Sequence, residues 1–125
     1  MRRLFLLAPL ILSMSEPVKN PKLKVELEDR SGIKHSLKGL VCNGKPFLRV
    51  REGNVEYSVD FSSLRGVEIL GQDGNQIRVR LLFRDRSSKE YFLPLNTYCR
   101  ANSQAGEAGF YLKEVKNIFI SMEER

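Results

Sequence analysis

Residues 59–69 read VDFSSLRGVEI, and residues 110–120 read FYLKEVKNIFI. In both segments the apolar residues recur at spacings of two, three, three and two. A spacing of two is typical of a strand with one buried face, and the wider spacings in the middle indicate a tight corner. The two segments therefore predict a repeated strand–corner–strand unit whose middle residue, Leu64 or Val115, enters the core. We expect a single helical or 3₁₀ turn at each corner.

The segments upstream of the two corners also correspond. Leu27–Ser31 (LEDRS) resembles Phe83–Ser87 (FRDRS), which predicts a strand followed by a turn in each half. We therefore predict two similar halves, at about residues 22–71 and 76–122, related by a pseudo-twofold axis. The alternative is chance similarity, because alternating β sequences resemble one another readily.

Alternation of apolar and polar residues continues through most of the chain. It is clearest at 22–28 (KLKVELE), 55–61 (VEYSVDF) and 77–83 (IRVRLLF). A period of two means one buried and one wet face, which favours an antiparallel sheet over a parallel one. Turn signals such as Asn43-Gly44 separate the runs at short intervals. The pattern predicts an all-β fold, and it leaves a small antiparallel β-sandwich and a barrel both open.

The composition limits the class of protein. The chain has 125 residues, of which 42% are hydrophobic and 29% are charged. This length suits one domain, and the apolar content excludes a disordered chain. No apolar run reaches the roughly 18 residues of a spanning helix, so no transmembrane segment is predicted. One His and two Cys argue against a dedicated zinc site, and we predict neither a metal nor a cofactor.

The N-terminus is typical of a secretory signal peptide. Met1–Arg3 is a positive n-region, and Leu4–Leu12 is a short apolar h-region. Small residues at Ser13 and Ser15 suit cleavage before Glu16, which predicts a periplasmic or extracellular protein. The alternatives are an apolar helix packed on the domain and a retained membrane anchor. The predicted organisation is a signal peptide (1–15), a linker (16–21) and a single domain (22–125).

The two cysteines are expected to pair. An even cysteine count in an oxidising compartment favours a Cys42–Cys99 disulfide over free thiols. The cysteines follow Asp29 and Asp85 by 13 and 14 residues, so we expect nearly equivalent places in the two halves and a bridge across the axis. The alternative is two buried thiols that never meet.

Two pairs of arginines lie on one side of their predicted strands. Arg49 and Arg51 form the first pair, and Arg78 and Arg80 form the second. If the two strands share a sheet face, a basic stripe results that could hold an acidic protein or an anionic envelope component. The alternative is a solvated face on which glutamates of neighbouring strands compensate the arginines. Nucleic acid is not expected as a partner of an exported protein.

The second half has no evident match to most of Phe47–Glu52. In its place stands an irregular stretch, residues 96–109 (NTYCRANSQAGEAG). Long loops in compact domains are often functional, so this loop is the first candidate for a partner surface. The alternative is a mobile connection. Its candidate contact residues are Tyr98, Arg100, Asn102 and Gln104.

No catalytic constellation is evident. His35 is the only histidine and has no identifiable partner, and the common hydrolase, zinc-protease and nucleotide motifs are missing. The leading hypothesis is a small exported, non-catalytic β-domain, a binding or structural module that offers a sheet face, a sheet edge or the 96–109 loop to another envelope protein or an anionic component. The alternatives are a small-ligand carrier with a pocket between the halves, and an enzyme that uses His35 or the thiols. No oligomeric state is predicted.

Overall fold

The computed structural model describes residues 22–122, which form one ten-stranded antiparallel sheet. The first half contains β1 (Leu23–Asp29), β2 (Lys34–Cys42), β3 (Phe47–Glu52), β4 (Val55–Asp60) and β5 (Leu64–Asp73). The second half contains β6 (Gln76–Phe83), β7 (Ser88–Pro94), β8 (Tyr98–Ser103), β9 (Gly106–Tyr111) and β10 (Val115–Met122). A 3₁₀ turn precedes the last strand of each half, η2 (Phe61–Ser63) and η3 (Leu112–Glu114). The all-β prediction and the predicted corner turns are confirmed. The predicted signal peptide and linker lie outside the described residues.

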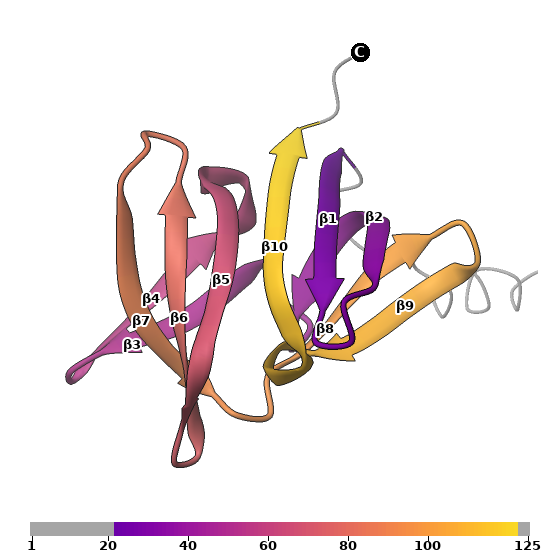
Figure 1. Ribbon diagram of the computed structural model, residues 1–125. Coiled ribbons are helices and arrows are strands. Elements are labelled where there is room, and N and C mark those ends of the chain that lie inside the picture. The colour runs from indigo at the N-terminus through magenta and orange to yellow at the C-terminus, as the bar shows by residue number, and fades with distance from the viewer. Residues whose placement is uncertain (1–21, 123–125) are drawn as a thin grey trace, which may run out of the picture.

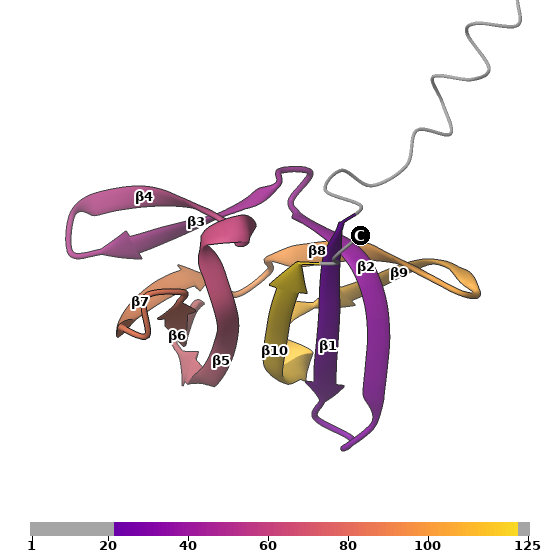
Figure 2. The same cartoon turned by 90° about the horizontal axis from the view of Figure 1, so that it is seen from above.

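The strand order shows the predicted pseudo-twofold repeat. The sheet runs β4-β3-β7-β6-β5-β10-β1-β2-β8-β9. Replacing each strand by its counterpart in the other half, β1 by β6 and so on, gives the same order in reverse. The axis therefore lies between β5 and β10, where Val67 pairs with Ile118. Both ends of the sheet curl, so that it takes the form of a half-barrel (Figure 1, Figure 2).

The two halves exchange hairpins. The β3–β4 hairpin of the first half pairs with β7 of the second half, and the β8–β9 hairpin of the second half pairs with β2 of the first. Each end of the sheet is therefore built from both halves of the chain. The two halves cannot separate without breaking the strand pairing at both ends.

The corner residues lie in the core as predicted. Leu64 and Val115 are 0% and 1% exposed, and Phe61 and Leu112 from the two 3₁₀ turns are each 1% exposed. Burying an apolar side chain of this size contributes about 1.5–3 kcal/mol. The corners thus hold the strands on either side of them against a common core.

The predicted correspondence upstream of the corners is wrong by two residues. Asp29 N–H donates to the carbonyl of Ile33, and Phe83 N–H donates to the carbonyl of Ser87. Asp29 therefore matches Phe83 and not Asp85. A slip of two residues keeps every side chain of a strand on its own face, so the alternation could not distinguish the two alignments.

Two arginines tie each half to the 3₁₀ turn of the other. Arg30 donates from its backbone N–H to the carbonyl of Glu114 at 2.9 Å, and from Nε to the carbonyl of Lys113 at 2.7 Å. Arg84 makes the equivalent bonds to two carbonyls of η2, at 3.2 and 2.7 Å. These paired bonds place the β1–β2 and β6–β7 turns against the corners of the opposite half.

Replacing Arg86 with glycine should stabilise the protein by about 1 kcal/mol. Arg86 has a φ of 76°, and its counterpart in the first half, Gly32, has a φ of 86°. A side chain disfavours this left-handed conformation, whereas glycine adopts it freely. Chemical denaturation of the purified protein measures the change. Gly32→Ala is the matched opposite and should lose a similar amount, and an unchanged or lower midpoint for Arg86→Gly would contradict the argument.

Candidate functional site

Most of residues 96–109 belong to the β8–β9 hairpin, which runs from Tyr98 to Tyr111, so the predicted irregular loop is wrong. β8 and β9 pair over six consecutive residue pairs, from Tyr98 with Tyr111 to Ser103 with Gly106. The hairpin is the counterpart of β3–β4, which means that Phe47–Glu52 does have a match in the second half. The glycines and polar residues of this segment favour turns over strands, and only pairing with β2 overrides that preference.

The two predicted surfaces are pseudo-symmetric copies of one another. The hairpin registers place Arg49 of β3 at the position of Arg100 in β8, and Arg51 at the position of Asn102. Tyr98, Arg100 and Asn102 share the face of β8 that points away from the core, and Gln104 lies in the turn that follows. β3 and β8 are near opposite ends of the strand order, and the cavity that Arg49 lines contains none of the four candidate residues of the second set.

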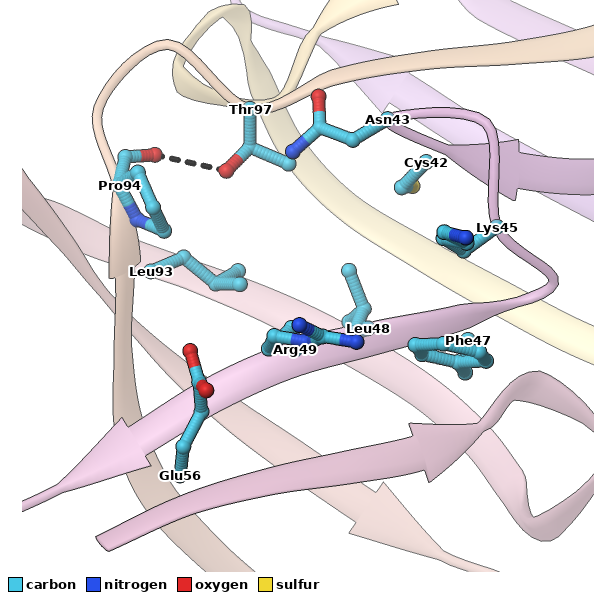
Figure 3. Close-up of a pocket in the computed structure, with 10 residues that line it drawn as sticks. All are labelled: Cys42, Asn43, Lys45, Phe47, Leu48, Arg49, Glu56, Leu93, Pro94 and Thr97. Atoms are coloured by element: carbon cyan, nitrogen blue, oxygen red, sulfur yellow. Dashed lines mark hydrogen bonds between the residues drawn. The ribbon is translucent and has the colours of Figure 1, made fainter.

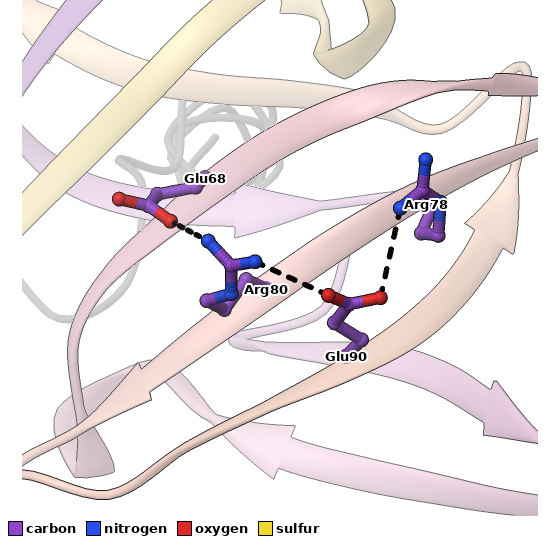
Figure 4. A network of polar contacts seen from close by, with 4 residues as sticks. All are labelled: Glu68, Arg78, Arg80 and Glu90. Atoms are coloured by element: carbon purple, nitrogen blue, oxygen red, sulfur yellow. Dashed lines mark hydrogen bonds and ion pairs between the residues drawn. The ribbon is translucent and has the colours of Figure 1, made fainter.

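Glutamates compensate the arginines of β6. Arg80 Nη1 lies 2.8 Å from Glu68 Oε1, and its Nη2 lies 3.2 Å from Glu90 Oε2 (Figure 4). Arg78 Nη1 lies 3.6 Å from Glu90 Oε1. The hydrogen bond with Glu68, followed by that with Glu90, raises the pKa of Arg80 above its ordinary value. β6 therefore presents the compensated face that was weighed as the alternative.

The arginines of β3 are separated from those of β6 by β7. Phe92 of β7 pairs with Arg51 on one side and with Arg78 on the other. In the second half, Arg100 forms an ion pair with Glu107. Within residues 22–122, Arg49 and Arg51 have no carboxylate within 4.0 Å. They are thus the candidates among the predicted arginines whose charge is uncompensated by a direct ion pair.

A cavity of about 240 Å³ opens where β3 and β7 diverge. In the described part of the chain, Arg51 with Phe92 is the single residue pair in the β3–β7 ladder. Pro94 ends β7 and has no N–H with which to extend the pairing. Figure 3 shows the side chains that surround the opening, from the end of β2, from β3, β4 and β7, and from the connections before β3 and after β7. We call this cavity the β3–β7 wedge, and its walls come from both halves of the chain.

The equivalent gap between β2 and β8 is closed. Three residue pairs join these strands, and the last of them, Cys42 with Cys99, is a disulfide. Asn43 continues the pairing beyond the disulfide, because its N–H donates to the Tyr98 carbonyl at 2.7 Å and its Oδ1 accepts the Tyr98 N–H at 3.1 Å. The β3–β7 wedge is therefore a departure from the symmetry of the fold.

The predicted disulfide is present, but the cysteines do not occupy equivalent places. Cys42 ends β2, whereas Cys99 lies in β8, whose counterpart is β3. Leu48 stands at the position equivalent to Cys99. The bond joins the two halves at the β2–β8 pair and not at the pseudo-twofold axis. The predicted equivalence depended on counting residues from Asp29 and Asp85. These two residues are not counterparts, because the two turns correspond with a shift of two residues.

His35 has a partner that the sequence did not reveal. Its Nε2 lies 2.9 Å from Asp29 Oδ2, and Asp29 Oδ1 accepts the backbone N–H groups of Ser31 and Ile33. The pair lines a cavity of about 270 Å³ between the β1–β2 hairpin and β9, and no Ser, Thr or Cys is in that lining. Residues 22–122 contain no group of three or more His, Cys, Asp or Glu that could hold a metal ion. Nothing in this arrangement indicates catalysis.

The stability of the protein should fall as the pH drops below about 4. The hydrogen bond with His35, followed by that from the N–H of Ile33, lowers the pKa of Asp29 below its ordinary value of 3.8. A folded-state pKa below the unfolded one means that the ionised carboxylate stabilises the fold above pH 3.8, and that this contribution is lost as the pH falls through the folded value. Urea midpoints measured between about pH 6 and pH 2 test this. Asp29→Asn should make the acid limb shallower, and an identical limb for the variant would count against the His35–Asp29 bond as its source.

Within residues 22–122, no helix has the length and apolar character needed to span a membrane.

Comparison with known proteins places the chain in a family. Residues 19–123 match the model of a family described as "Uncharacterised protein". An uncharacterised protein of Aquifex aeolicus (strain VF5) is 35% identical over 119 residues, a region that covers 92% of this chain and 90% of the relative. Neither description names an activity, a ligand or a partner. With nearly its whole length matched in both comparisons, the chain belongs to this family of uncharacterised proteins.

Proposed function

We propose that the protein is a small exported, non-catalytic β-domain that binds a partner protein of the cell envelope by strand addition. The observation that carries the proposal is the pair of free sheet edges. β4 and β9 end the sheet, and no strand within residues 22–122 pairs with their outer sides. The backbone N–H and C=O groups of a free edge can pair with an extended segment of another protein.

The two edges lack most of the features that block such pairing. β4 (VEYSVD) and β9 (GEAGFY) contain no proline and no lysine, and each pairs with its neighbour over six residues without a bulge. Val55 and Tyr57 on β4 and Tyr111 on β9 are large side chains that remain exposed. Because the charged residues of both edges are all acidic, we expect the partner segment to carry basic residues.

The buried disulfide supports export. Disulfides persist in oxidising compartments and are rare where thiols are kept reduced. Cys42 and Cys99 are 4% and 0% exposed, so their bond is part of the core and not a surface accident. Together with the signal-like N-terminus, the disulfide favours a protein that folds in the periplasm or outside the cell. An anionic envelope component is the weaker candidate partner, because several of the arginines that would hold it are already paired.

Intact mass tests the export part of the proposal. The protein is recovered from its exporting host and weighed before and after reduction and thiol alkylation. We expect a chain that begins at Glu16 and whose two thiols are protected until reduction. A chain that retains its first residues and has two reactive thiols would overturn export.

Site-specific photocrosslinking in the exporting host tests strand addition. A photoreactive residue replaces Ser58 on the edge strand β4 or Glu107 on the edge strand β9. Ser36 is the matched control, because it is also exposed but lies on β2, an interior strand. We expect a discrete adduct with an envelope protein from an edge position and none from Ser36. Adducts of equal yield from all three positions, or none from either edge, would contradict the proposal.

A small-ligand carrier is the second candidate function, and one observation favours it. The β3–β7 wedge takes its walls from both halves of the chain, where a pocket between the halves was expected.

A further inference from the structure

We infer that the β3–β7 wedge binds a small amphipathic anion, a carboxylate or phosphate monoester carried on a short apolar group. The inference rests on the second candidate function and deepens it, and it does not require a partner strand on β4 or β9. Three observations support it: the asymmetry of the gap, the charge around its mouth and the chemistry of its walls.

The open gap is not a requirement of the topology. The equivalent gap in the other half is closed by three residue pairs between β2 and β8, with a register shift among them, by the Cys42–Cys99 disulfide and by the bonds between Asn43 and Tyr98. In the wedge, Leu48 occupies the position that Cys99 occupies in the other half, so no disulfide can form there. Pro94 has no backbone N–H, so it cannot donate a hydrogen bond from the end of β7. The fold can thus close this gap, and this sequence leaves one copy open.

The mouth of the wedge carries a net positive charge. Lys45 and Arg49 line it, and within residues 22–122 neither has a carboxylate within 4.0 Å. Glu56 is the one acidic residue of the lining, so two cations face one carboxylate. The Arg49 guanidinium lies 5.6 Å from the centre of the Phe47 ring, which holds it at the rim. By contrast, its counterpart Arg100 is neutralised by Glu107.

The walls of the wedge combine apolar surface with a neutral donor. Phe47 and Pro94 supply apolar surface that is not buried, above Leu48 and Leu93, which are 1% and 2% exposed. Asn43 uses its Oδ1 to accept the Tyr98 N–H, which leaves its amide N–H₂ group as a donor on the side of Thr97 (Figure 3). An oxyanion at the cations, with an apolar group against Phe47 and Pro94, would satisfy both parts of the lining.

The volume limits the size of the ligand. About 240 Å³ lies below the roughly 300–1,000 Å³ of sites for drug-sized molecules. The wedge therefore suits a single ring or a short alkyl group with one anionic head, and it is too small for a whole lipid. Phenyl phosphate and benzoate are probes of this size that represent the two head groups.

Amide chemical shifts of the isotope-labelled domain, with its disulfide intact, measure the binding. We expect saturable shifts confined to residues 42–49, 56 and 93–97 on titration with phenyl phosphate or benzoate, and the probe that binds more tightly identifies the head group. Inorganic phosphate should bind at least about tenfold more weakly, because it lacks the apolar group, and benzyl alcohol should bind at least about tenfold more weakly, because it lacks the charge. Raising the ionic strength should weaken the binding of the anions and leave the binding of benzyl alcohol unaffected.

Pseudo-symmetry provides the matched variants. Arg49→Gln should weaken the binding of phenyl phosphate by about tenfold or more. Arg100→Gln is the same change at the equivalent position of the closed half, and it should leave the affinity for phenyl phosphate unchanged. Glu56→Gln should tighten binding, because it removes the opposing charge. Both arginines are on the sheet surface, and unchanged spectra of the free variants establish that each still folds.

The outcomes separate this inference from the proposed function. Shifts that do not saturate, equal losses in the Arg49 and Arg100 variants, or equal binding of benzyl alcohol would overturn the wedge as an anion site. Neither cleavage before Glu16 nor crosslinking from Glu107, on the edge strand at the other end of the sheet, involves Arg49. Loss of binding here therefore leaves the strand-addition proposal standing, and the reverse also holds.

Discussion

Replacing Cys42 and Cys99 together with alanine should lower the free energy of unfolding by about 2–4 kcal/mol. The disulfide spans a sequence separation of 57 residues, so it restricts a long loop of the unfolded chain. It also joins β2 of the first half to β8 of the second, at the junction where one exchanged hairpin meets the rest of the sheet. Urea denaturation of the oxidised protein and of the double variant gives the difference.

The same experiment has an internal control. The wild-type protein unfolded in the presence of a reductant should approach the double variant, because both lack the bond. The rate of amide hydrogen exchange should increase most in β8 and β9, which the disulfide connects to β2, and least in β6 and β7. Equal midpoints for the oxidised protein and the double variant would show that the ladder between β2 and β8 suffices without the bond.

Replacing Gly66 with alanine should cost about 1–3 kcal/mol, as overpacking of a close backbone contact does. A Cβ at this position would lie 2.6 Å from the carbonyl oxygen of Ile118, an atom of the backbone that has no rotamer by which to move away. The contact is at the pseudo-twofold axis, where β5 and β10 share three residue pairs. To relieve the clash, β5 and β10 would therefore have to move apart, and these two strands join the two sides of the sheet.

Gly71 is the matched control for Gly66. Both glycines lie in β5, yet a Cβ at Gly71 would have no atom within 4 Å, and its φ lies outside the left-handed region. Gly71→Ala should therefore be neutral or slightly stabilising, since alanine loses less backbone entropy on folding. Thermal and urea denaturation of the two variants compares them directly. A similar loss in both would mean that strand glycines in general, and not the approach to Ile118, set the cost.

The sequence predicted those features that depend on local periodicity. The alternation over Val55–Phe61 and Ile77–Phe83 predicted strands with one buried face, because a period of two survives whatever partner a strand takes. The spacing at both corners placed Leu64 and Val115 in the core for the same reason. The Cys42–Cys99 bond was predictable because two cysteines allow a single intramolecular pairing.

The sequence could not predict those features of the candidate sites that depend on which strands become neighbours. The exchange of hairpins brings β3 beside β7, and nothing in the pattern of Phe47–Glu52 names that partner. The same pairing separates Arg51 from Arg78 by Phe92, and it places Glu68 and Glu90 against Arg80. Asp29 reaches His35 only because a turn folds one back upon the other.

The contrast has a physical cause. The face that a side chain presents is decided within its own strand, and burial of that face is favourable in any antiparallel sheet, so the β-fold and its core followed from the order of residues alone. The order of strands depends on contacts between residues far apart in the chain, and a slip of two residues leaves each face unchanged. The open wedge beside Arg49 and its closed counterpart beside Arg100 were therefore decided by the tertiary pairing of β3 with β7 and of β2 with β8.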